Sequence, residues 1–126
     1  MKHPATSPER IQTIIDRLGG VRAYASAVGV SQSTVRTWLR GKSKPSIPKQ
    51  KAIARLHGQH ATPAEAKMVY WVLSATDEAL RDSVINAKCD NAPKPVMDKL
   101  YEEMWQIRRW TADYLYVARS KIETPE

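Results

Sequence analysis

Five polar side chains at helical spacing have the chemistry needed to hydrogen-bond with base edges. They are Gln32, Ser33, Arg36, Thr37 and Arg40. At about 100° per residue, the last four share one helix face and Gln32 lies at its N-terminal tip. In the major groove, Arg can bond a guanine bidentately, Gln an adenine, and Ser or Thr a base or a phosphate. The spacing therefore favours a helix that reads double-stranded DNA over an ordinary solvated helix face.

The residues around this polar face predict two short helices that share a core. Apolar side chains recur at helical intervals on both sides of residue 29. They are Tyr24, Ala25, Val28, Val30, Val35, Trp38 and Leu39. Gly29 can take the left-handed conformation that ends a helix, and Ser31 can cap the helix that follows. Residues 19–44 are therefore predicted to form a helix-turn-helix, with small Ala25 at the helix crossing.

This stretch resembles the helix-turn-helix of the Cro and lambda-repressor (Xre-like) family, particularly small regulators of prophages and toxin-antitoxin loci. The matching positions are residues 18–20, Ala25, residues 29–32, Val35, residues 38–41 and Pro45. The resemblance covers about the first half of the chain, although Tyr24 is bulkier than the residue expected there. It implies a lambda-repressor-like bundle that binds operator DNA, usually as a dimer, with its second helix in the major groove.

The distribution of charge points to the same half of the chain. Residues 1–58 hold eleven Lys or Arg against two acidic residues, a net charge of +9, whereas residues 59–126 carry −2. A basic region that carries a helix-turn-helix suits binding to phosphates. Four residues that flank the polar face are expected to contact phosphates. They are Arg22, Ser31, Lys42 and Lys44.

Composition argues against several other classes of protein. No apolar run approaches the roughly 18 residues of a membrane span, and the N-terminus lacks the apolar segment of a signal peptide, so we expect a cytoplasmic protein. The single cysteine, Cys89, excludes an intramolecular disulfide and a thiolate zinc site. His57 is interpreted as a partly cationic residue at a helix end and His60 as part of a linker. The sequence predicts no metal site and no cofactor.

Capping and breaking residues predict an all-α chain. The expected helices span residues 8–18, 21–28, a short stretch after Ser31, 48–57, a segment from Pro63 onwards, and 95–122. A second capping signal at Thr76 is expected to kink or restart the fifth helix, and residues 86–95 to form a break. The predicted organisation is a DNA-binding domain over residues 1–58, a boundary at 59–61, and a helical dimerisation or partner-binding region over 62–122.

The second half of the chain carries more apolar surface than two helices can bury between them. The residues expected to meet a partner are Trp71, Leu100, Met104, Trp105, Ile107, Trp110 and Tyr114. A second copy of the chain would cover them. Two alternatives are that they pack against the first half and each other, and that an aromatic and methionine cluster binds a small effector.

These patterns favour a sequence-specific DNA-binding transcription regulator, a repressor that binds a pseudopalindromic operator as a homodimer. The alternative is an antitoxin whose tail binds a toxin, or a phage DNA-packaging subunit that forms rings. An enzyme acting on DNA is disfavoured. The carboxylates are scattered over polar positions of amphipathic helices, and the sequence lacks a phosphate-binding glycine loop and a nucleophile motif.

Overall fold

The computed structural model describes residues 6–123, which form six α-helices and no strand. The helices are α1 (Pro8–Leu18), α2 (Val21–Val28), α3 (Gln32–Leu39), α4 (Ile47–His60), α5 (Pro63–Cys89) and α6 (Lys94–Glu123). Residues 1–5 of the predicted first domain lie outside this description. The predicted all-α fold, with an N-terminal helix-turn-helix bundle and a long C-terminal helix, is confirmed.

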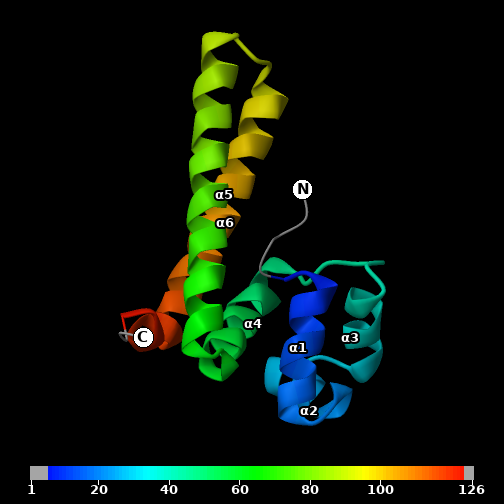
Figure 1. Ribbon diagram of the computed structural model, residues 1–126. Helices are drawn as coiled ribbons and strands as arrows, with labels where there is room; N and C mark the ends of the chain where they lie inside the picture. Colours follow the sequence, from blue (N-terminus) through cyan, green and yellow to red (C-terminus); the bar gives the residue numbers. More distant parts are fainter. Residues whose placement is uncertain (1–5, 124–126) are drawn as a thin grey trace.

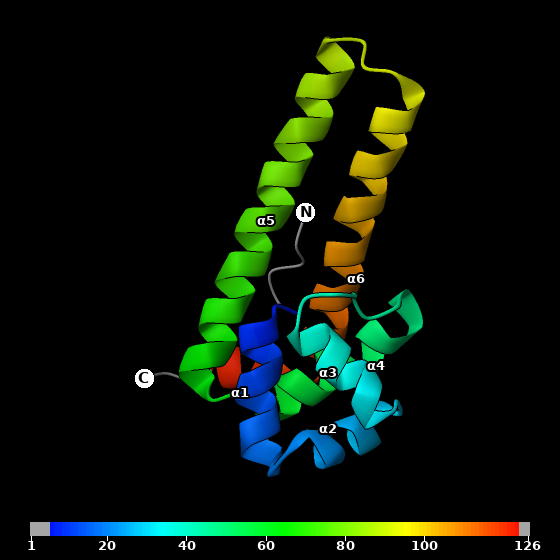
Figure 2. The same ribbon diagram turned by 90° about the vertical axis from the view of Figure 1, so that its right-hand side faces the viewer.

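Three layers make up the molecule (Figure 1). Helices α1 to α3 form a small head, α4 lies beside them, and α5 and α6 form an antiparallel hairpin. The hairpin rises well beyond the head in both views, while the lower part of α6 packs against α4 (Figures 1 and 2). Helix α3 lies on the side of the head remote from α5 and α6. Its outer face is therefore not covered by the tail.

Three helices begin at the caps that the sequence predicts. The hydroxyls of Ser7, Ser31 and Thr62 accept hydrogen bonds from the backbone N–H groups three residues later, at 3.4, 3.1 and 3.2 Å. These bonds satisfy donors that a helix N-terminus leaves without an internal partner. Local side-chain chemistry therefore sets where α1, α3 and α5 begin.

Two predicted interruptions are wrong. Residues 59 and 60 belong to α4 rather than to a linker. Helix α5 continues without a restart past Thr76, whose hydroxyl donates to the Val72 carbonyl at 2.7 Å. This bond to the preceding turn is a common arrangement of Thr inside a helix, so Thr76 is not a cap. The break that was predicted over residues 86–95 is shorter and covers residues 90–93, between α5 and α6.

The head and the tail share one continuous core. A single cluster of buried side chains extends from Ile11 in α1 to Ala118 in α6. At Gly58, an added Cβ would lie 2.5 Å from Val117 Cγ2 and 3.0 Å from the Tyr114 carbonyl oxygen. Only glycine allows α4 and α6 to approach this closely. Helix α4 therefore belongs as much to the tail as to the head.

Part of the predicted partner surface lies inside this core, which corrects the sequence-based assignment. Ile107, Trp110 and Tyr114 are only 3%, 2% and 1% exposed. The rings of Trp110 and Tyr114 stack at 5.2 Å between centroids, and Trp110 meets His57 of α4 edge-on. These three residues stabilise the packing of a single chain. Leu100 and Met104 are half-buried, whereas Trp71 and Trp105 remain 70% and 63% exposed.

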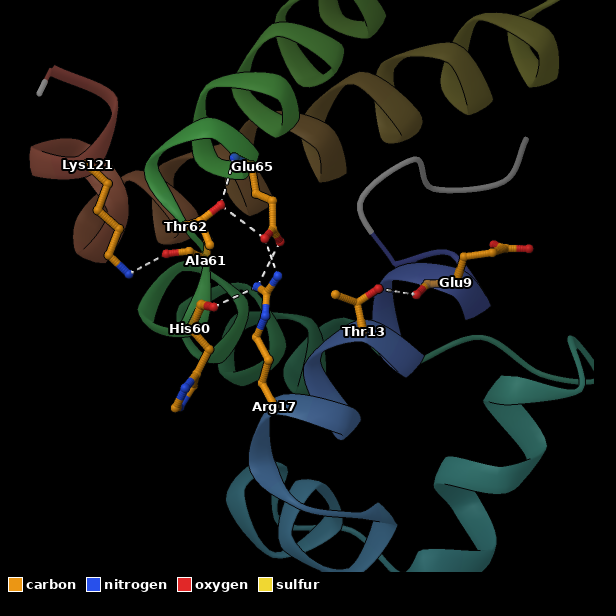
Figure 3. Close-up of polar contacts among 8 residues, drawn as sticks. All are labelled: Glu9, Thr13, Arg17, His60, Ala61, Thr62, Glu65 and Lys121. Carbon is orange, nitrogen blue, oxygen red and sulfur yellow. Dashed lines mark hydrogen bonds and ion pairs between the residues drawn. The ribbon is translucent and has the colours of Figure 1, made fainter. Parts of the chain in front are cut away.

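Charged side chains from two other helices hold the C-terminal end of α4 (Figure 3). Lys121 Nζ donates to the carbonyl oxygens of Gly58, Gln59 and Ala61 at 3.0, 2.6 and 2.9 Å. Arg17 donates to the carbonyl oxygen of His60 at 2.8 Å. Carbonyls at a helix C-terminus lack internal partners and carry partial negative charge, so cations stabilise them. This joint ties α1 and α6 to the end of α4.

The same arginine connects the joint to the start of α5. Arg17 forms a bidentate ion pair with Glu65, one of whose bonds measures 2.7 Å. Glu65 Oε1 also accepts from the Thr62 hydroxyl at 3.0 Å, so the side chains of the predicted capping-box pair bond each other. The hydrogen bond between the Arg17 and Glu65 side chains lowers the pKa of Glu65 and raises the pKa of Arg17. Four helices thus meet at one polar cluster that fixes the tail relative to the head.

Candidate nucleic-acid interface

The turn between α2 and α3 has the geometry that the sequence predicts. Gly29 has a φ of +83°, in the left-handed region, and its N–H donates to the Ala25 carbonyl at 2.9 Å. The N–H of Val30 donates to the same carbonyl at 3.0 Å. A residue other than glycine would be strained in this conformation. The two helices are therefore joined by a tight turn, and the segment is a helix-turn-helix.

Sequence reasoning missed one residue that supports this turn. Lys49, expected to face outwards from α4, donates from Nζ to the carbonyl oxygen of Gly29 at 3.1 Å. The bond ties α4 to the end of α2, where the carbonyls carry partial negative charge. No spacing rule could reveal it, because the contact joins residues twenty positions apart.

The buried side of α3 determines which side chains face outwards. Val35 and Trp38 are 0% and 4% exposed and pack in the head core. On the opposite side Ser33, Arg36 and Arg40 are exposed. Gln32 and Thr37, the other two predicted base contacts, are half-buried. All five lie on α3 or at its C-terminal cap, so the structure brings them together on one element.

Hydrogen bonds within α3 organise this face. Arg36 donates from its guanidinium to Gln32 Oε1 at 3.3 Å, one helical turn away. Thr37 donates from its hydroxyl to the Ser33 carbonyl at 2.9 Å. Because the Thr37 proton is used inside the helix, Thr37 would meet a base as an acceptor or through its methyl group. Arg36 and Gln32, which are joined by a hydrogen bond, both keep further N–H donors that can reach base edges.

The four predicted phosphate contacts are all exposed. Arg22 lies in the first turn of α2, and Lys42 and Lys44 lie between α3 and α4. Ser31 differs from the other three, because its hydroxyl caps α3 and also bonds the Thr34 hydroxyl at 2.9 Å. Cationic side chains thus precede and follow α3 along the chain.

A buried polar pair holds α2 against α4. A hydrogen bond of 2.8 Å joins the Tyr24 hydroxyl and His57 Nε2, and the two residues are 0% and 4% exposed. The bulky Tyr24 is therefore accommodated by reaching across to α4. Burial lowers the pKa of His57 to about 3 and raises that of Tyr24. His57 is a neutral core residue, which corrects the prediction of a partly cationic residue at a helix end.

Two further features of residues 6–123 bear on other classes of site. No helix there is long and apolar enough to cross a membrane. That part of the chain also brings together no group of three or more His, Cys, Asp or Glu side chains that could hold a metal ion.

Part of the sequence is similar to that of a known protein. Over 51 residues, or 40% of its length, the chain is 37% identical to a Haemophilus influenzae protein described as an uncharacterized HTH-type transcriptional regulator. The matched region makes up 21% of that relative, which is a longer protein than this chain. No protein-family model and no solved structure matches the chain. The geometry of α2 and α3 and this similarity together support a helix-turn-helix protein.

Proposed function

We propose that the chain is a sequence-specific DNA-binding transcription regulator, a cytoplasmic repressor without catalytic activity. The observation that carries this proposal is the uncovered outer face of α3. There Ser33, Arg36 and Arg40 are exposed on the side of the head remote from the tail. The net charge of +9 on residues 1–58 supports the same proposal, because basic residues attract the phosphate backbone.

In the proposed complex, α3 enters the major groove with Arg36 and Gln32 towards base edges. The exposed Arg22, Lys42 and Lys44 contact phosphates on either side of the groove. The protein acts as a homodimer through its tail, so two copies of α3 read the two halves of a pseudopalindromic operator. Adjacent half-sites on one side of a duplex are about 34 Å apart.

Two substitutions separate base contacts from phosphate contacts. Arg36→Ala is expected to weaken binding to the preferred duplex by about 1–3 kcal/mol, because a bidentate contact with guanine is lost. Lys42→Ala is expected to weaken binding to all sequences alike and to reduce the salt dependence by about one phosphate. Fluorescence anisotropy with the preferred and a scrambled duplex, at several salt concentrations, measures both effects. If neither substitution changed the affinity, the assignment of α3 to the groove would be wrong.

A second candidate function rests on the exposed tryptophans of the tail. Trp71 and Trp105 are 70% and 63% exposed, whereas tryptophan side chains are on average largely buried. They favour, as an alternative, an antitoxin that binds a toxin or a phage DNA-packaging subunit that assembles into rings. The mass of the purified particle separates these functions, since a ring has many copies and an antitoxin complex contains a second kind of chain.

A further inference from the structure

One face of α5 combines a protruding aromatic side chain with an open hollow. The hollow measures about 360 Å³ and extends along a little over three turns of the helix. Its lining consists of Trp71, Val72, Ala75, Thr76, Ala79, Leu80 and Ser83. Trp71 lies at one end and is 70% exposed, while the small residues Ala79 and Ser83 lie towards the other end. The face thus carries both a projection and a recess that a bulky side chain can enter.

The chemistry of this face limits what can cover it. None of the seven lining residues is charged, so the surface offers nothing to phosphate groups or to a strongly charged peptide. The other exposed tryptophan has different surroundings, because the hollow beside Trp105 is also lined by Lys51, Glu102, Arg109 and Asp113. The α5 face is therefore suited to another uncharged helix with small and aromatic residues.

We propose that this uncharged α5 face binds the same face of a second copy, with the two α5 helices antiparallel. A two-fold contact reverses the direction of the partner helix, which places the Trp71 end of one copy over the Ala79 and Ser83 end of the other. With the axis between Ala75 and Thr76, Trp71 lies opposite Leu80 of the partner subunit. Each hollow then receives the tryptophan of the other copy.

The position of the heads agrees with this arrangement. The head joins α5 at Pro63, about 19 Å along the helix from the proposed axis at 1.5 Å per residue. Antiparallel pairing therefore places the two attachment points about 38 Å apart along the helix direction, with one head at each end of the pair. The middle and upper turns of α5 rise beyond the head, so the head leaves this part of the helix open (Figures 1 and 2). This inference rests on the proposed homodimer and assigns its surface.

Two exposed alanines provide a matched test by solution mass. Ala79 lies in the α5 hollow, and Ala112 is also exposed but lies in the middle of α6, outside the hollow. Ala79→Arg is expected to raise the dimer dissociation constant by about 100-fold or more, because the isologous contact would bury two unpaired guanidinium groups. Ala112→Arg is expected to leave it unchanged. Sedimentation equilibrium gives both values, and circular dichroism checks that both variants are folded.

Every outcome of the mass measurement decides the proposal. A monomeric Ala79→Arg with a dimeric Ala112→Arg supports the α5 face. Dimers in both variants, loss of the dimer in both or only in Ala112→Arg, or a wild-type chain that is monomeric or pairs only with another protein would overturn it. DNA affinity is measured separately with the same samples. A failure to bind DNA would contradict the proposed function and still leave the α5 dimer measurable.

Disulfide cross-linking tests the register of the pair. In a Cys89→Ser background, Ala75→Cys places thiols next to the proposed two-fold axis and is expected to give a covalent dimer on mild oxidation. Ser74→Cys, one position along and on another side of α5, is expected to remain largely monomeric. Equal cross-linking of both variants would contradict the antiparallel register.

Discussion

Replacing Trp110 by Ala is expected to lower the free energy of unfolding by about 3–5 kcal/mol. The indole is 2% exposed, stacks on Tyr114 and meets His57 of α4. Its removal would leave a cavity where the head and the tail share their core. Denaturant unfolding, with wild type and variant at the same protomer concentration, measures the loss.

A second tryptophan on the same helix provides the control. Trp105 is 63% exposed, so Trp105→Ala is expected to change the unfolding free energy of the monomer by no more than about 0.5 kcal/mol. If Trp110→Ala does not fold, Trp110→Phe, which retains a ring on Tyr114, gives a milder loss. Similar losses for Trp105→Ala and Trp110→Ala would contradict the assignment of Trp110 to the shared core.

The stability of the protein is expected to fall as the pH drops below about 6.5, because of His57. Burial lowers its pKa from 6.5 to about 3 in the folded chain. Between these values the unfolded chain binds a proton that the folded chain does not, so acid favours unfolding. The loss should reach about 2 kcal/mol between pH 7 and pH 5, at about 1.4 kcal/mol per pH unit. Above pH 6.5 this contribution is fully retained.

A histidine variant that cannot titrate isolates this effect. His57→Gln keeps a hydrogen-bonding group near the Tyr24 hydroxyl but binds no proton, so its stability should change much less than that of the wild type between pH 7 and pH 5. Glu65 acts at lower pH, because its lowered pKa means that its stabilisation is lost only as the pH falls through that value. An unchanged slope in His57→Gln would exclude His57 as the cause.

Local signals made much of the fold predictable from the sequence. The caps Ser7, Ser31 and Thr62 and the turn at Gly29 act within a few residues of themselves, so their effects can be read directly. The polar face of α3 was predictable for a related reason. Once Val35 and Trp38 are placed in the core, helical geometry decides which residues face outwards.

Contacts between distant segments account for what the sequence did not reveal. Trp105 and Trp110 lie on the same predicted helix about 140° apart, and their types alone do not tell which one α4 covers. The contact of α4 with α6 depends on Gly58, and the joint depends on Lys121, sixty or more residues further along the chain. Such pairings need the folded arrangement, which is why three of the seven predicted partner residues proved to be core.

Selection of bound sequences from a random duplex pool tests the central claim most directly. The purified wild-type chain is expected to enrich an inverted repeat with half-sites about one helical turn apart, bound by two copies. Arg36→Ala, assayed in parallel, should lose that preference while retaining salt-sensitive binding to all sequences. Enrichment of no sequence by the wild type, or the same enriched sequence from Arg36→Ala, would contradict the assignment of α3 as the DNA-reading helix.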